Sequence, residues 1–214
     1  MDLESPAKTR SLVVVSAGLS QPSSTRLLAD RLAAAVERQT DMPVDRRTIE
    51  LRDHAQDLAN NLLTGFPSAE LQASIDAVLK ADGLVAVSPI FNASYSGLFK
   101  SFFDVIEHDA LRGMPVLIGA TGGTARHSLA LEHALRPLFA YLGAAVVPTA
   151  VYAAAEDWGR GEMPADAGLA ARIERAAGQL ALAMTALPRL PAADPFEEPT
   201  PFDQLLRGPE RGGR

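Results

Sequence analysis

The stretch Ser88-Pro-Ile-Phe-Asn-Ala-Ser-Tyr-Ser-Gly97 joins two apolar segments of different periodicity. The run from Gly83 to Val87 before it predicts a buried strand, and residues 96–108 after it repeat with the period of a helix. Ligands of open α/β sheets bind beyond the carboxyl ends of the strands, so this hydroxyl-rich and amide-rich turn is a candidate site. Taken alone, the stretch is better explained as an ordinary loop with a serine at the helix N-cap.

The composition is that of one sizeable cytoplasmic domain. A chain of 214 residues with 47% hydrophobic content can bury a core without cross-links. It has no cysteine, which excludes disulfides, thiolate metal sites and cysteine nucleophiles and fits a reducing compartment. The first ten residues are polar, and the apolar run of residues 12–15 is too short for a signal peptide or a membrane span. The net charge of -6 argues against a nucleic-acid groove but not against a phosphorylated cofactor, which hydroxyls and helix N-termini can bind.

Apolar runs and helical patterns alternate along the chain. Strands are expected at residues 11–16, 44–51, 84–87, 116–120 and 144–151, and helices from residue 26 and at 68–80, 96–108, 125–142 and 164–187. Pro137 should loosen its helix around His133, and residues 52–67 show no periodic pattern. This alternation predicts an α/β fold, a flavodoxin-like three-layer sandwich with a five-stranded parallel sheet of order 2-1-3-4-5. Residues 1–188 would form this domain, and the proline-rich tail of residues 189–214 would be disordered or dock on a partner subunit.

Two further loops have unusual compositions. Residues 17–25 form a hydroxyl-rich loop that runs into a helix, a geometry that suits a phosphate monoester, although its serines are equally well explained as helix caps. Thr121-Gly-Gly-Thr124 follows the fourth strand, and its glycines let the backbone pass close to a flat ligand or adopt positive φ, or form a plain turn. The expected strand order places all three loops at one edge of the sheet, which favours a single ligand site over three coincidences.

With these loops, the sequence resembles the NAD(P)H-dependent FMN reductases of the flavodoxin-like superfamily. The likeness covers roughly residues 11–151 and is greatest for the branch that supplies reduced flavin to two-component monooxygenases. It rests on residues 16–26, 89–100 and 121–137. The first loop departs from the family pattern, which usually has an arginine where Ser20 stands and often an asparagine near Ser24.

The resemblance implies that the protein uses FMN and NAD(P)H. Hydride would pass from nicotinamide directly to flavin N5, so no catalytic side chain and no metal are expected. The first loop would hold the FMN phosphate, the stretch after the third strand would line the ring and ribityl chain, and the Gly-Gly loop would lie beneath the ring with His127 at its rim. The implied flavin-binding residues are Ser16, Ser20, Ser23, Ser24, Thr25, Pro89, Ile90, Phe91, Asn92, Ser94, Tyr95, Ser96, Thr121, Gly122, Gly123, Thr124 and His127.

The resemblance also implies partners. Family members commonly pack the helix that carries His133 against another subunit, and the helix of residues 96–108 is apolar on two sides, so a homodimer or homotetramer is expected. A flavin-dependent monooxygenase would receive the reduced flavin. Alternatives are a reductase that holds FMN tightly and reduces quinones or azo dyes, a non-enzymatic flavodoxin-type electron carrier, and a flavin-free scaffold.

Two points stay open in the sequence. NADPH recognition needs a cation for the 2′-phosphate, and Arg26, Arg126 and Arg160 are candidates that cannot be ranked. Trp158 is either a cover over the site or a packing residue.

Overall fold

A computed structural model of the protein describes residues 9–158 and 168–186. Its sheet has the order β2-β1-β3-β5-β6, with β7 also paired to β5, and all of these pairs are parallel. The short β4 pairs antiparallel to β3. The predicted flavodoxin-like sheet is therefore confirmed. The strands are β1 (Arg10–Ser16), β2 (Val44–Glu50), β3 (Gly83–Phe91), β4 (Ser94–Tyr95), β5 (Pro115–Gly122), β6 (Ala145–Val146) and β7 (Val151–Ala154).

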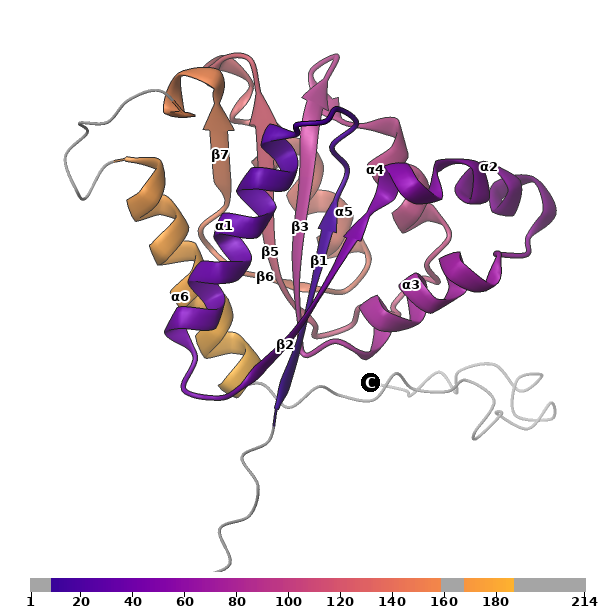
Figure 1. Ribbon diagram of the computed structural model, residues 1–214, viewed down its shortest axis with the longest axis horizontal. Coiled ribbons are helices and arrows are strands. Elements are labelled where there is room, and N and C mark those ends of the chain that lie inside the picture. Colours follow the sequence, from indigo (N-terminus) through magenta and orange to yellow (C-terminus); the bar gives the residue numbers. More distant parts are fainter. Residues whose placement is uncertain (1–8, 159–167, 187–214) are drawn as a thin grey trace, which may run out of the picture.

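Helices cover both faces of this sheet, as Figure 1 shows. One face carries α1 (Ser24–Gln39) and α6 (Leu169–Ala186). The opposite face carries α2 (Ala55–Thr64), α3 (Ala69–Lys80), α4 (Gly97–Asp104) and α5 (Arg136–Tyr141). No helix in the described part of the chain is long and apolar enough to cross a lipid bilayer. The predicted helix start at residues 164–167 and the tail of residues 189–214 lie outside the described residues.

Alternate residues of the interior strand β1 enter two separate cores. Leu12 and Val14 of β1 pack with α1 and α6, whereas Val13 and Val15 face the helices on the other side. This follows from the two-residue period of a strand that is buried on both faces.

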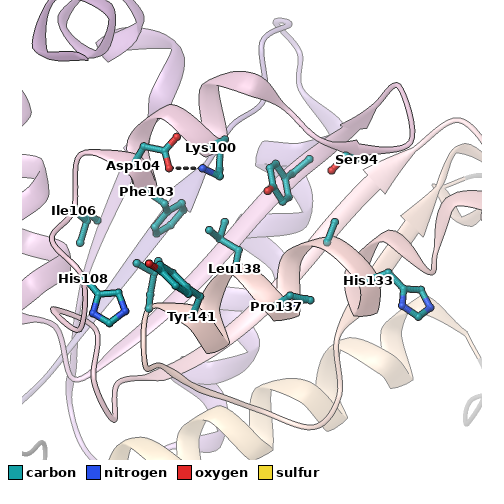
Figure 2. A pocket seen from close by; sticks show the side chains of 13 residues that line it. Ser94, Lys100, Phe103, Asp104, Ile106, His108, His133, Pro137, Leu138 and Tyr141 are labelled. Atoms are coloured by element: carbon teal, nitrogen blue, oxygen red, sulfur yellow. Dashed lines mark hydrogen bonds and ion pairs between the residues drawn. The ribbon is translucent and has the colours of Figure 1, made fainter. Parts of the chain in front are cut away.

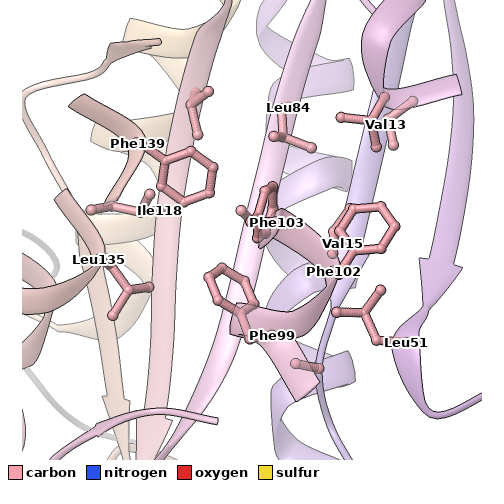
Figure 3. Close-up of a cluster of buried hydrophobic side chains, with 14 of the residues drawn as sticks. Val13, Val15, Leu51, Leu84, Phe99, Phe102, Phe103, Ile118, Leu135 and Phe139 are labelled. Carbon is pink, nitrogen blue, oxygen red and sulfur yellow. The ribbon is translucent and has the colours of Figure 1, made fainter. Parts of the chain in front are cut away.

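The core on the side of the sheet that carries α2, α3, α4 and α5 is built around the phenylalanines of α4 and α5 (Figure 3). The rings of Phe103 and Phe139 meet edge to face with their centroids 4.8 Å apart. Phe99, Phe102 and Phe103 are all fully or almost fully buried, so a single chain already covers both apolar sides of this helix. The two apolar sides therefore do not by themselves require a second subunit.

The polar segment of residues 52–67 is not an irregular connection. Residues Leu51–His54 form a 3₁₀ turn, and α2 follows and ends at Gly65, which has a φ of 78° and donates its N–H to the carbonyl of Asn61 over 2.8 Å. Within α2 only Leu58 and Asn61 are buried. Two buried positions in a short helix are too few to produce a recognisable hydrophobic period, which is why the sequence pattern did not reveal it.

The fifth strand and the helix of residues 125–142 are both interrupted. Pro148 lies between β6 and β7, and a proline cannot donate the N–H that a continuous ladder needs. The predicted long helix consists of a 3₁₀ turn at Ala125–His127, a π-helix at Leu131–Leu135 and then α5. In the π-helix the N–H of Arg136 donates to the carbonyl of Leu131, so the helix is loosened around His133 as Pro137 predicts.

Candidate functional site

A cavity of about 540 Å³ opens at the carboxyl edge of the sheet, where the loops after β1, β3, β5 and β7 converge. It is lined by Leu19, Ser20, Ser23, Ser24, Thr25, Pro89, Ile90, Phe91, Thr121, Gly122, Gly123, Ala155 and Trp158. All but three of these residues are in the set named from the sequence. Segments far apart in the chain thus form one chamber that is lined by both hydroxyl groups and apolar side chains.

The loop after β1 presents hydroxyl groups at the start of α1. Ser23 is the N-cap of this helix, and its Oγ accepts the N–H of Arg26 over 3.2 Å. A side chain at Gly18 would place its Cβ 2.0 Å from the Oγ of Ser23, so only glycine lets the loop close in this way. The first backbone N–H groups of α1 and the positive end of its dipole are directed toward the cavity side of this loop.

Ser16, just before the same loop, has an unsatisfied polar group and is not among the residues that line the cavity. It ends β1, is 1% exposed, and its Oγ has no hydrogen-bond partner among residues 9–158 and 168–186. A buried hydroxyl without a partner costs about 1–3 kcal/mol. Such a group is expected where a bound polar ligand completes the hydrogen bonding.

Thr25 and Thr121 tie the first loop to β5. Their Oγ1 atoms are 2.8 Å apart, and both residues are buried. One hydroxyl donates to the other, so one of the two protons is left for a third acceptor. This bond sets the distance between the hydroxyl-rich loop and the Gly-Gly loop.

The stretch after β3 folds differently from the expected strand-to-helix turn. The strand continues to Phe91 and turns back through Asn92 and Ala93, whose φ angles are 47° and 71°, into β4. Two consecutive residues with positive φ are typical of the type I′ turn of a two-residue hairpin. Pro89, Ile90 and Phe91 consequently line the cavity, while Asn92 is exposed at the turn and lies outside the lining.

The hairpin directs the next residues away from this cavity. Ser96 is the N-cap of α4: its Oγ accepts the N–H of Phe99 over 3.2 Å, and its own N–H donates to the Oγ of Ser88 over 2.9 Å. Ser94 and Tyr95 line a different cavity of about 660 Å³ between α4 and α5, which Figure 2 shows. The structure therefore does not bring these three predicted flavin ligands to the chamber at the sheet edge.

The Gly-Gly loop needs glycine because of a close contact. A Cβ on Gly122 would lie 2.1 Å from the hydroxyl oxygen of Tyr152. That hydroxyl donates to the carbonyl of Thr124 over 2.8 Å, and burial together with the charge of Asp157 raises the pKa of Tyr152. Thr124 and His127 are exposed and are not among the residues that line the cavity.

One wall of the cavity was not predicted by any sequence motif. Ala155 and Trp158 belong to the 3₁₀ turn Ala155–Trp158, which directly follows β7. Asp157 holds this turn: it accepts the N–H of Ala154 over 2.8 Å and pairs with Arg172 of α6 at 3.1 Å. The sequence placed the strand end at residue 151, so the approach of this turn to the site could only be seen in three dimensions.

A parallel sheet of this order with a ligand chamber at its carboxyl edge defines a flavodoxin-like protein. The chain belongs to the NADPH-dependent FMN reductase family, whose model matches residues 10–159.

Curated relatives agree with this assignment. The chain is 43% identical over 170 residues to a protein of Pseudomonas aeruginosa described as FMN reductase (NADPH), an alignment that covers 79% of this chain and 90% of the relative. It is 39% identical over 145 residues to the NADH-dependent FMN reductase SfnF of Pseudomonas putida, which covers 68% of this chain and 77% of the relative. These two relatives are thus named for different nicotinamide nucleotides.

Solved structures share the fold. An oxidoreductase from Corynebacterium diphtheriae superposes with a TM-score of 0.80 at 46% identity, over 84% of this chain and 99% of that chain. The apo form of an NADH:FMN oxidoreductase (EMOB) superposes with a TM-score of 0.73 at 31% identity, over 84% of this chain and 92% of that one.

Proposed function

We propose that this protein binds FMN in the chamber at the sheet edge, reduces it with NAD(P)H and releases the reduced flavin to a partner monooxygenase. The single observation that carries the proposal is the convergence of the hydroxyl-rich loop, the end of β3 and the Gly-Gly loop around one cavity of about 540 Å³. Membership of the FMN reductase family supports the same conclusion.

The residues present fit the chemical groups of FMN. Ser23 and Ser24 offer hydroxyl groups at the N-terminus of α1, which suits a phosphate monoester, and the buried hydroxyl of Ser16 at the end of β1 has no partner in the described residues. Pro89 and Ile90 offer an apolar wall for a flat ring. The Thr121–Gly123 loop brings backbone close to that wall, where its amides can serve the polar edge of the ring.

The proposed chemistry needs no protein acid or base. Flavin, when bound, accepts hydride from a nicotinamide at N5. The chain would orient the two ring systems and exclude water between them. Tyr152 supports this role indirectly, because its buried hydroxyl holds the carbonyl of Thr124 and so shapes the Gly-Gly loop.

Release of reduced flavin is supported by the exposure of the chamber. Phe91 lines it and is 47% exposed, and Ser20 and Ser24 are also exposed. A reductase that keeps FMN for a quinone or azo acceptor, and a flavodoxin-type carrier, are the competing functions. Both would need a more enclosed flavin than these residues suggest.

We also propose that the protein is a homodimer or homotetramer that uses the α4–α5 face. On this face Tyr141 is 70% exposed, and it shares the cavity of about 660 Å³ with Leu138, Pro137 and His133 (Figure 2). Light scattering after size exclusion tests the assembly, and Tyr141→Arg should lower the measured mass. The cytoplasmic location stays a prediction.

The function is tested by measuring oxidation of NADH and NADPH with and without added FMN. Turnover that rises with added FMN, in a protein purified without tightly held flavin, is the expected result. A retained flavin with quinone-dependent turnover would favour the second function. Absence of flavin binding at micromolar FMN would refute the proposal.

A further inference from the structure

The arginines around the chamber differ in how they are paired. Arg26 forms ion pairs with Asp30, at 2.9 Å, and with Glu50. Arg52 pairs with the same Glu50 at 2.8 Å and with Asp53 at 3.6 Å. Both guanidinium groups are thus neutralised by carboxylates. Arg26 joins the start of α1 to the end of β2, whereas Arg52 also donates to the carbonyl of Ser20 over 3.3 Å. Their positive charges are therefore already balanced by neighbouring carboxylates.

Arg31 is different. In residues 9–158 and 168–186 it forms no ion pair with a carboxylate, and its guanidinium carbon lies 5.0 Å from the ring centroid of Trp158, over the indole. Trp158 itself lines the chamber. An exposed cation is therefore held on an aromatic wall of the ligand site, at the side formed by α1 and the turn after β7.

Trp158 is in turn fixed from two directions. Its neighbour Asp157 accepts the N–H of Ala154 and pairs with Arg172 of α6. On the other side the guanidinium of Arg31, from α1, lies over its ring. Contacts from both α1 and α6 therefore hold the turn that carries Trp158. The indole ring has a defined position at the ligand site.

We infer that Arg31 and Trp158 form the subsite for the adenosine 2′-phosphate end of NADPH, and that they give the protein a preference for NADPH over NADH. This inference rests on the proposed function. A planar guanidinium binds phosphate oxygens through its N–H groups while its face lies on an aromatic ring, and an indole offers a flat surface to a purine. Arg126, the remaining candidate cation in the described chain, follows Thr124 and is not among the residues that line the chamber.

The test compares kcat/KM for NADPH and NADH at saturating FMN. The wild-type protein should prefer NADPH, and Arg31→Gln should lower the ratio of the two kcat/KM values about tenfold, the effect of one exposed guanidinium–phosphate contact. Arg126→Gln is the matched control and should leave the ratio as it is. Equal use of both nucleotides by the wild-type protein, or a ratio that changes with Arg126→Gln and not with Arg31→Gln, overturns the inference.

Two further measurements separate this inference from the proposed function. Adenosine 2′,5′-bisphosphate should inhibit competitively with NADPH and more strongly than ADP, and this difference should disappear in Arg31→Gln. The preference for NADPH should also weaken as ionic strength rises, since an exposed charge contact is screened by salt. If these differences are absent while FMN is still reduced, only the inference fails, whereas failure to reduce FMN with either nucleotide refutes the proposed function.

Discussion

The hydroxyl of Thr25, at the start of α1, is hydrogen-bonded to the hydroxyl of Thr121, near the end of β5, with the two oxygen atoms 2.8 Å apart. These residues are 96 positions apart in the chain, and both are buried. The bond joins the loop proposed for the phosphate to the loop proposed for the ring. The bond therefore fixes the positions of these two loops relative to each other.

Replacing one partner of this bond should cost more than replacing both. Thr25→Val leaves the Thr121 hydroxyl buried without its partner, a loss of about 1–3 kcal/mol in the free energy of unfolding. The double variant with Thr121→Val removes both hydroxyls and should recover part of that loss. Urea unfolding of the wild type, the two single variants and the double variant gives the coupling energy between the two hydroxyls. Strictly additive losses would show that the bond does not stabilise the fold.

Ser16→Ala should have opposite effects on stability and on flavin binding. The Ser16 Oγ is buried without a partner in the described chain, so its removal should leave the flavin-free protein equally stable or more stable. FMN affinity should fall, because the hydroxyl is proposed to meet the phosphate. Ser88→Ala is the control: this hydroxyl accepts the N–H of Ser96, so its loss should destabilise the protein. Unchanged FMN affinity in Ser16→Ala would remove Ser16 from the site.

Ala93→Gly should stabilise the β3–β4 hairpin. Ala93 has a φ of 71°, a conformation that disfavours residues with a Cβ by roughly 1–2 kcal/mol. Glycine removes this strain but raises the entropy of the unfolded chain, so a net gain of about 0.5–1 kcal/mol is expected. Thermal and denaturant midpoints measure it. A loss of stability would mean that the methyl group makes contacts that outweigh the strain.

Gly122→Ala should be harmful, and Tyr152→Phe should partly suppress the harm. The new Cβ would lie 2.1 Å from the Tyr152 hydroxyl oxygen and 3.2 Å from the ring carbon that bears it. Overpacking of this kind costs about 1–3 kcal/mol. Removing the hydroxyl relieves the closest contact, so the double variant should be more stable than Gly122→Ala alone. Gly123→Ala, where a Cβ meets open space, is the matched control.

Alkaline pH should reduce the stability that Tyr152 provides. Burial and the nearby charge of Asp157 raise the pKa of Tyr152 above its ordinary value of 10.0. The folded protein then retains a proton that the unfolded chain releases, so this contribution is fully present below pH 10 and is lost as the pH rises through the raised pKa. The difference in unfolding free energy between wild type and Tyr152→Phe should therefore narrow above pH 10, and a constant difference would contradict the assignment.

Much of the fold follows from local pattern. The apolar run of residues 12–15 predicts a strand buried on both faces, and Ser68 predicts the start of a helix that the structure begins at Ala69 with Ser68 as its cap. The parallel strand order then places the loops after β1, β3 and β5 together, which is why most of the residues that line the chamber could be named in advance.

Other features depend on contacts between distant segments. Ser94 and Tyr95 belong to residues 89–100, one of the three stretches that resemble the family, yet the two-residue turn at Asn92 and Ala93 directs them to the cavity between α4 and α5. Trp158 reaches the chamber in the turn after β7, which is held by Asp157 and Arg172. No short-range pattern encodes either outcome.

The sequence by itself determined the class of fold, the order of the strands and three of the four loops that form the site, since these depend on hydrophobic period and on the chirality of parallel connections. Only the tertiary structure decided which hydroxyls face the chamber and which arginines are already neutralised. Glu50 pairs with both Arg26 and Arg52, while Arg31 lies over Trp158 without a carboxylate in the described chain. Side-chain pairing depends on distances across the fold, and these are set only when the strands and helices have packed.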